Sequence, residues 1–355
     1  MFVGGEFYYD NSWLAEKPGT DTRAMTFLNG GKACLMVISD YLRDHGINKI
    51  LLPSYLCPTI LNTLENCGLT YGFYQVRPDL SIDLEDLICQ SREYRVVYFI
   101  NYFGFPRAPE EVALLHDLRR SGKLLVEDNA QTGFNQETIG DFSFNSMRKL
   151  CAYDGGYLET TADIQPYLMR RISPPNRRMP LIREYRSRLV EYLFQSRGGW
   201  EELNRLYRLA ELYYESDPIV EGDADERRQI EHLDWPGIME KRRENYRYLL
   251  NLISGLPELT PLFTDIPEGV MPLGLPVYIR AVPRDWLFDR LGEAGIGLTI
   301  HWDAILRDPR LNRNPLAAEM AGKMLTLVID QRVTHKHLDY QAQTIRICIQ
   351  KYRRD

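Results

Sequence analysis

The sequence lacks the cysteine patterns that mark zinc modules and disulfide-rich secreted proteins. Its six cysteines are scattered, with no C-x-x-C pair and no histidine partners at zinc spacing. We therefore expect free thiols, no bound metal and a reducing, cytoplasmic compartment. Residues 1–10 contain Glu6 and Asp10 but no basic region followed by an apolar stretch, so we expect no secretion signal there.

An excess of positive charge and long apolar runs are missing as well. The formal net charge of −6 provides no general attraction to nucleic acid or to anionic membranes. No apolar run approaches the length that crosses a membrane. The first predicted strand is not followed by G-x-G-x-x-G, which argues against a nicotinamide-dependent oxidoreductase. The expected partners are therefore small molecules, with neither nucleic acid nor membrane among them.

Hydrophobic periodicity in the first half of the chain predicts alternating strands and helices. Apolar residues recur on one helical face over residues 32–45, and Gly46 follows as a stop signal. A second helix is predicted over residues 109–121. Strands covered on both faces are predicted by the near-continuous apolar runs at residues 49–53, 69–76, 95–101 and 123–128. This alternation predicts an α/β fold with a mainly parallel central sheet between helices, which binds ligands at the carboxyl ends of its strands.

The second half of the chain has a different character. Residues 160–231 read as long, charged helices, and Asp234-Trp235-Pro236 interrupts them. A chain of 355 residues can hold one large and one smaller domain. We predict a large domain over residues 1–235 with a helical extension, and a small C-terminal α+β domain over 236–355. The elements expected in the small domain are helices at 240–253 and 285–294, a strand at 276–281 and terminal strands.

One basic stretch stands out within the helical extension. Its arginines allow two interpretations, a solvated helix face paired to nearby acids or an anion-binding surface facing a phosphorylated ligand, and we favour the first. The residues concerned are Arg170, Arg171, Arg177, Arg178, Arg183, Arg186 and Arg188.

Two segments of the first half could bind a phosphorylated ligand. L-N-G-G-K-A at residues 28–33 opens the first predicted helix, where free backbone N–H groups form a phosphate cradle, unless Asn29 simply caps the helix. V-E-D-N-A-Q at residues 126–131 places Asp128 at the carboxyl end of a strand. A carboxylate there could keep a pyridine nitrogen protonated, or it could cap the next turn.

A third segment contains a lysine that could form a Schiff base. Lys149 follows Ser146 by three residues and is adjacent to Arg148, and Gly155-Gly156 come next. A lone lysine in a loop is usually surface charge. The order of the three segments is more informative than any one of them: phosphate turn, strand-end aspartate, Ser-x-x-Lys, then Gly-Gly before a strand.

This order resembles fold-type-I pyridoxal-phosphate enzymes, and more narrowly the DegT/DnrJ/EryC1/StrS aminotransferase family. The resemblance implies pyridoxal 5'-phosphate as the cofactor and catalytic roles for Lys149 and Asp128. Lys149 would carry the cofactor, and Asp128 would pair with its pyridine nitrogen. The other implied contacts are backbone N–H groups of Gly31 and Lys32 to the phosphate, the Ser146 hydroxyl to the same phosphate, and Gln131 to the 3'-oxygen.

L-P-S-Y-L-C-P-T at residues 52–59 resembles a family segment whose aromatic residue stacks on the cofactor ring. Tyr55 is the available aromatic, but it lies two residues before the expected position, Cys57, so the ring contact is open between them. Sugar aminotransferases also carry a G-Y-N-Y-R segment that reaches the partner subunit's site. Only N-R-R-M at residues 176–179 approximates it, which leaves the sugar substrate open.

Near the C-terminus, two further residues are candidates for substrate contact. His301, beside Trp302, could pack or bind substrate, and we favour packing. Arg332 could hold the carboxylate of an amino-acid donor in a bidentate manner.

The sequence therefore predicts a PLP-dependent aminotransferase that moves an amino group from an amino-acid donor to a small carbonyl acceptor, with a nucleotide-linked keto sugar as one candidate. The resemblance also implies a homodimer with shared active sites. Two alternatives stay open: a PLP enzyme of a specialised biosynthetic pathway acting on a non-sugar substrate by transamination, elimination or decarboxylation, and a non-catalytic binding protein with this fold.

Overall fold

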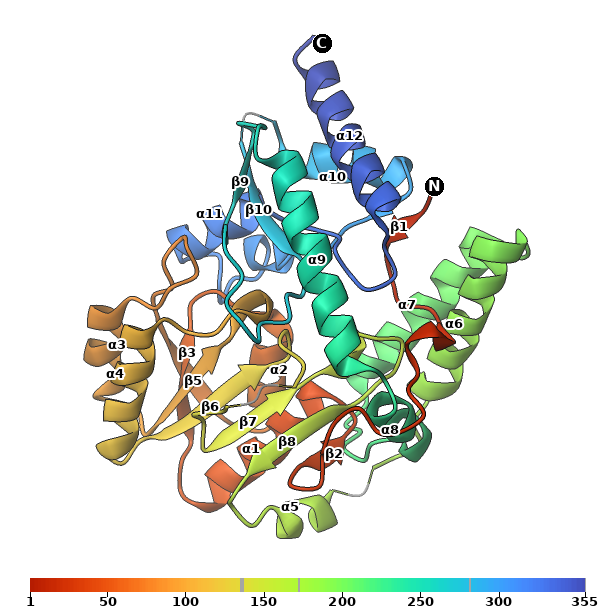
Figure 1. The fold of residues 1–355 in the computed structure, drawn as a ribbon. Helices are drawn as coiled ribbons and strands as arrows, with labels where there is room; N and C mark the ends of the chain where they lie inside the picture. Colours follow the sequence, from red (N-terminus) through yellow and green to blue (C-terminus); the bar gives the residue numbers. More distant parts are fainter. Residues whose placement is uncertain (135–136, 172, 281, 355) are drawn as a thin grey trace.

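A seven-stranded sheet forms the centre of the larger part of the protein (Figure 1). The computed structural model describes residues 1–134, 137–171, 173–280 and 282–354. The strand order is β2-β8-β7-β6-β5-β3-β4, in which β8 runs antiparallel to both its neighbours and the other pairs are parallel. The strands are β2 (Thr26–Leu28), β3 (Lys49–Pro53), β4 (Thr70–Tyr74), β5 (Val96–Ile100), β6 (Leu124–Asn129), β7 (Phe142–Asn145) and β8 (Gly156–Thr160).

The helices of the first half connect the parallel strands and pack beside them (Figure 1). They are α1 (Gly31–Asp44), α2 (Pro58–Asn66), α3 (Leu84–Ser91) and α4 (Pro109–Arg120). The four predicted strands and both predicted helices are found within two residues of their expected bounds. All five residues of β5 are buried, as expected for a strand covered on both faces. The predicted α/β fold with a mainly parallel central sheet is therefore confirmed.

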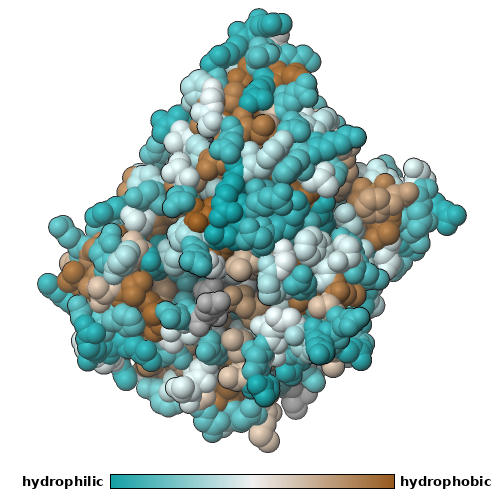
Figure 2. Space-filling model, viewed as in Figure 1, coloured by the Kyte–Doolittle hydropathy of each residue, from teal (hydrophilic) through white to brown (hydrophobic). Residues whose placement is uncertain are grey.

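In the part of residues 160–231 that the structure describes, the helical extension is found as four helices after β8. They are α5 (Gln165–Arg170), α6 (Arg178–Gln195), α7 (Trp200–Ser216) and α8 (Ala224–Glu231). α6 and α7 pack against each other as a hairpin that projects from the body of the protein (Figure 1). The hairpin exposes the apolar side chains of Phe194, Trp200 and Leu212, and Figure 2 shows hydrophobic surface gathered over it.

Every arginine of the basic stretch is paired with a carboxylate, which supports the first of the two interpretations. Two of them depart from it, because Arg178 and Arg186 are buried instead of solvated. Both bind the buried carboxylate of Asp154, at 2.5 and 2.6 Å. This part of the extension is therefore held to the β8 side of the large sheet by internal charge pairs.

The C-terminal part is built on a three-stranded antiparallel sheet of order β12-β10-β9. Its elements are α9 (Trp235–Ile253), β9 (Leu259–Pro261), β10 (Leu275–Ile279), α10 (Arg284–Glu293), β11 (Ile296–Gly297), α11 (Pro315–Lys323), β12 (Met324–Leu327) and α12 (His335–Tyr352). α9 begins at residue 235, five residues before the predicted start, because the Asp234 side chain caps it by accepting the Gly237 N–H.

The prediction of terminal strands needs a correction, because the chain ends in helix α12 after β12. Leu338, Ala342, Ile345 and Ile349 are buried at intervals of three or four residues, which is the helical spacing. Short turns of 3-10 helix also occur at residues 11–13, 102–104, 147–149 and 303–306.

The N-terminus lies with the C-terminal part. β1 (Val3–Gly4) pairs in parallel with β11. The domain boundary at residue 235 stays a prediction. If the chain is divided there, residues 3–4 belong to the C-terminal domain, because their strand pairs with β11. Among the residues described, no helix combines the length and apolar character needed to cross a membrane.

Candidate active site

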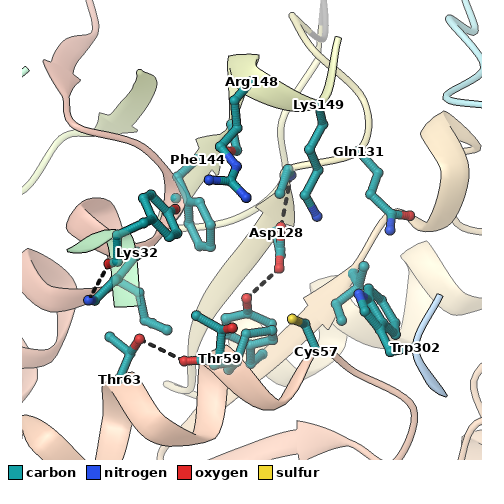
Figure 3. Close-up of a pocket in the computed structure, with 18 of the residues that line it drawn as sticks. Lys32, Cys57, Thr59, Thr63, Asp128, Gln131, Phe144, Arg148, Lys149 and Trp302 are labelled. Carbon is teal, nitrogen blue, oxygen red and sulfur yellow. Dashed lines mark hydrogen bonds between the residues drawn. The ribbon is translucent and has the colours of Figure 1, made fainter. Parts of the chain in front are cut away.

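A pocket of about 730 Å³, including its mouth, opens where the carboxyl ends of β5, β6 and β7 meet the start of α1 (Figure 3). Parallel strands bring their carboxyl ends to one edge of the sheet, which is why residues distant in sequence meet here. Six of the seven residues predicted to bind a cofactor lie on its wall: Gly31, Lys32, Asp128, Gln131, Ser146 and Lys149.

One end of the pocket is formed by the N-terminus of α1. Gly30 has φ +130°, a conformation that favours glycine, and the helix starts at Gly31. The N–H groups of the first helical turn have no partner within the helix, so they face the pocket as donors at the positive end of the helix dipole. The Ser146 hydroxyl oxygen lies 3.9 Å from the position that a Cβ on Gly30 would occupy. Together these groups form an anion cradle.

The Lys32 side chain contributes to the site in a way that the sequence did not indicate. Its ammonium donates to the backbone carbonyl oxygens of Tyr214 and Glu215, at 2.8 and 2.7 Å, and to that of Asp217 at 3.3 Å. Lys32 thus binds the last carbonyl groups of α7, where a cation is favourable. The backbone of Lys32 stays in the cradle while its side chain ties α7 to α1.

Asp128 lies on the floor of the pocket and is 6% exposed. The Tyr98 hydroxyl donates to one carboxylate oxygen and the Ala130 N–H to the other, at 2.8 Å. Among the described residues no cation lies within ion-pair distance of this carboxylate. Burial raises the pKa of Asp128, only partly offset by the Tyr98 hydrogen bond and the charge of Lys149. A cationic group bound here would relieve the cost of burying the charge.

Gln131 carries a donor that the described part of the chain leaves unpaired. Its side chain is 2% exposed, and Oε1 accepts the Phe103 N–H at 2.6 Å. Nε2 is buried without a hydrogen-bond partner in the described residues, and the side chain lines the pocket. An unpaired buried donor costs about 1–3 kcal/mol unless a ligand accepts it.

Lys149 follows β7 in a short 3-10 turn, and Figure 3 shows its side chain pointing into the pocket toward Asp128. The D-G-G segment after it supports this turn. Gly155 accepts the Met147 N–H at 2.9 Å, and a Cβ on Gly156 would lie 2.4 Å from the Asn145 carbonyl oxygen. Glycine at residue 156 therefore allows the lysine turn to sit directly against β8.

The assignment of Tyr55 to the cofactor ring needs a correction. Tyr55 is fully buried behind the pocket wall, where its hydroxyl donates to the His301 carbonyl oxygen and its ring contacts Trp302 at 5.3 Å. Cys57 instead lines the pocket, and so does Trp302. Of the two positions left open by the sequence, the structure places Cys57 on the wall.

A second cavity of about 1150 Å³ adjoins the first and shares Cys57, Arg148, Lys149 and Trp302 with it. His301 lines it while Nδ1 of its ring lies 2.9 Å from the Thr326 hydroxyl oxygen. Burial, together with the charge of Lys149, lowers the pKa of His301 to about 3, so the imidazole is neutral. His301 is thus both packed, as expected, and present on a cavity wall.

Arg332 is not available to bind a substrate carboxylate, which corrects the expectation for it. Its guanidinium binds both oxygens of Asp330, at 3.0 and 2.8 Å, and the backbone oxygens of Gly5 and Glu6. It also stacks over the Phe7 ring at 4.1 Å. Arg332 therefore holds the N-terminal segment in place.

Sequence reasoning missed two tyrosines of the site. Tyr98 had a detectable signal, because alternation along the predicted strand at 95–101 places it on the same face as Ile100, which also lines the pocket. Tyr214 had none, since it comes from α7, far from every motif.

The fold has counterparts among solved sugar aminotransferases. A candidate sugar aminotransferase of Streptococcus pneumoniae, Spr1654 in its PLP form, aligns with a TM-score of 0.68 at 14% identity, covering 99% of each chain. DesI, solved in the presence of its TDP-sugar product, aligns with 0.66 at 16% identity over 94% of this chain and 84% of its own. A DegT/DnrJ/EryC1/StrS aminotransferase from Brucella abortus gives 0.61 at 15% identity, over 91% and 85%.

At these identities the likeness establishes the fold, which is that of PLP-dependent sugar aminotransferases, as the resemblance implied. No protein-family model matches the chain. No curated protein matches it in sequence either.

Proposed function

We propose that this protein is a PLP-dependent aminotransferase that moves an amino group from an amino-acid donor to a small carbonyl acceptor. The observation that carries this proposal is the meeting of three groups in one pocket: the α1 N-terminus, the buried carboxyl of Asp128, with which no cation of the described residues forms an ion pair, and Lys149. Bound there, pyridoxal phosphate would supply an electron sink for chemistry at the donor's α-carbon.

The groups that line the pocket fit this cofactor in kind. The N–H groups of Gly31 and Lys32 and the Ser146 hydroxyl would bind its phosphate. Asp128 would pair with the protonated pyridine nitrogen, which would place a cation beside the buried carboxylate. Nε2 of Gln131, which has no hydrogen-bond partner among the described residues, would donate to the 3'-oxygen. Lys149 would attach the cofactor through Nζ and is the group placed to move a proton within the pocket.

The adjoining cavity supports a substrate larger than the amino donor. Lys149 lies on its wall, which is also formed by the N-terminal segment Gly4–Phe7 and by Tyr207. A nucleotide-linked keto sugar is the acceptor that we propose, because DesI, which has this fold, was solved with a TDP-sugar product. We also propose a cytoplasmic biosynthetic enzyme that acts as a homodimer with shared active sites. The exposed apolar face of the α6–α7 hairpin supports the dimer.

One observation favours a non-sugar acceptor as the second candidate. The N-R-R-M segment at residues 176–179 bonds within its own chain, where Asn176 donates to the Asn29 side chain at 3.1 Å and Arg177 pairs with Asp217. It is thus engaged at the start of α1 and at the end of α7 in place of reaching outward.

The proposal is tested by adding pyridoxal phosphate to the apo-protein, recording the absorbance spectrum, reducing with borohydride and mapping the modified peptide. We expect the label on the peptide that contains Lys149, no label in Lys149→Ala, and normal labelling in Lys17→Ala, a change at an exposed lysine. Protein that takes up no cofactor would overturn the proposal. Glutamate added to the loaded protein should then release 2-oxoglutarate, which separates a transaminase from a binding protein.

A further inference from the structure

Tyr214 reaches the anion cradle from a helix outside the large sheet. It lies near the end of α7 and lines the pocket. Its hydroxyl oxygen is 3.4 Å from the position that a Cβ on Gly30 would occupy, and the Ser146 hydroxyl oxygen is 3.9 Å from the same point. The two hydroxyl groups therefore flank the start of α1 together.

The Tyr214 hydroxyl has no hydrogen bond to any of the residues that the structure describes, although the rest of the residue is held on several sides. The guanidinium groups of Arg148 and Arg178 lie 4.2 and 5.1 Å from its ring centre. Both arginines bind Glu211, which lies one helical turn before Tyr214 on the same face of α7. Lys32 binds the Tyr214 carbonyl oxygen at 2.8 Å.

This arrangement preorganises a neutral donor. Burial raises the pKa of Tyr214 to about 12, partly opposed by the charges of Arg148 and Arg178, so the phenol keeps its proton at neutral pH. A phosphate bound at a helix N-terminus still has oxygen lone pairs to satisfy, and a fixed hydroxyl meets that need without loss of side-chain entropy on binding.

We propose that the Tyr214 hydroxyl is a phosphate ligand of the cofactor, supplied by α7 of the same chain. This inference rests on the proposed cofactor site. It makes the α6–α7 hairpin part of that site: Lys32 and the Arg148–Glu211 pair dock the helix, and Tyr214 closes the phosphate end of the pocket.

The test measures the dissociation constants of pyridoxal phosphate and of pyridoxal, which lacks the phosphate, by quenching of tryptophan fluorescence in the apo-protein. Trp302 lines the pocket and provides the signal. The variant is Tyr214→Phe, which keeps the ring under the arginines and removes only the hydroxyl. Tyr213→Phe is the matched control, since Tyr213 is the neighbouring tyrosine and stacks under Arg177 at 4.0 Å.

We expect Tyr214→Phe to weaken pyridoxal phosphate binding about 10-fold, the usual effect of losing a hydrogen bond to a charged group, and to leave pyridoxal binding unchanged. Tyr213→Phe should bind both ligands as the wild type does. Equal affinity of Tyr214→Phe and wild type for pyridoxal phosphate would overturn the inference alone, as would an equal loss for both ligands. A wild-type protein that binds neither ligand would overturn the proposed function with it. Thermal midpoints of the three apo-proteins check that each is folded.

Discussion

Arg148 and Lys149 are adjacent in sequence, yet their charges lie in different environments. The Arg148 guanidinium binds both carboxylate oxygens of Glu211, at 3.0 and 2.8 Å. Lys149 has no carboxylate within ion-pair distance among the described residues, and its side chain points into the pocket (Figure 3). The two neighbouring cations therefore differ in position: Arg148 holds α7 against the pocket, and Lys149 extends into the pocket itself.

Glu211→Gln should loosen the attachment of α7. Glu211 binds Arg148 and Arg178 and its side chain is 26% exposed, so losing the charge should lower the free energy of unfolding by about 1–3 kcal/mol. Urea unfolding measures the change. The matched control is Glu202→Gln on the same helix, an exposed partner of Arg188 that should cost less than about 0.5 kcal/mol. Equal effects of the two substitutions would contradict the docking role of Glu211.

Asp128→Asn should stabilise the apo-protein while weakening the binding of the cofactor. Burial raises the pKa of Asp128 above its ordinary value of 3.8, so the folded protein binds a proton more tightly than the unfolded chain. That contribution to stability is complete below pH 3.8 and is lost as the pH rises through the folded-state pKa. The amide of Asp128→Asn stays neutral at every pH. The thermal midpoint of the variant should therefore equal that of the wild type in acid and exceed it by a growing margin toward neutral pH.

For cofactor binding, we expect the Asp128→Asn substitution to be unfavourable. Loss of the charge opposite the pyridine nitrogen should reduce pyridoxal phosphate affinity by about 10-fold or more, since a charge-assisted hydrogen bond is lost. An Asp128→Asn protein less stable than wild type at neutral pH would contradict the burial argument. Unchanged cofactor affinity would contradict the pairing.

Asp154→Asn should be strongly destabilising. Although burial opposes it, Arg186 and Arg178 hold the pKa of Asp154 well below its ordinary value of 3.8. Removing one charge of this buried cluster leaves two buried arginines short of a partner, which should cost about 3–5 kcal/mol at neutral pH.

The pH dependence of that loss has a defined sign. A lowered pKa contributes stability that is present above pH 3.8 and lost as the pH falls below it, so the gap between wild type and Asp154→Asn should narrow in acid. Thermal midpoints of both proteins across the acid range measure it. Asp225→Asn, in an exposed pair with Arg228, should show no such gap.

Tyr55→Phe separates stability from cofactor binding. The change removes the donor to the buried His301 carbonyl oxygen and should cost about 1–3 kcal/mol in unfolding free energy. Because the ring lies behind the pocket wall, pyridoxal phosphate affinity should stay within about twofold of wild type, measured by fluorescence titration. A large loss of affinity for pyridoxal phosphate with unchanged unfolding free energy would indicate that Tyr55 contacts the cofactor ring after all.

The strands and helices of the first half were predictable because local burial determines them. A run such as residues 96–100 is apolar at every position only where both faces of a strand are covered. Helix α12 was missed because its pattern of Leu338, Ala342, Ile345 and Ile349 is diluted by charged neighbours. Such a segment becomes helical through its packing against α9 and α10, which the sequence does not reveal.

For the site, the sequence by itself determined which segments carry the candidate functional groups and in what order they follow along the chain. They are the glycine turn at residues 30–31, Asp128 at a strand end and Lys149 after Ser146. Topology then brings these to one sheet edge, because parallel strands share their carboxyl ends. Only the tertiary structure decided which side chains face the pocket. Lys32 finds its carbonyl partners 182 or more residues away, and Tyr214 enters from α7. Such contacts depend on how separate elements pack against each other. A local sequence pattern does not encode how far apart two elements lie or which way their side chains point.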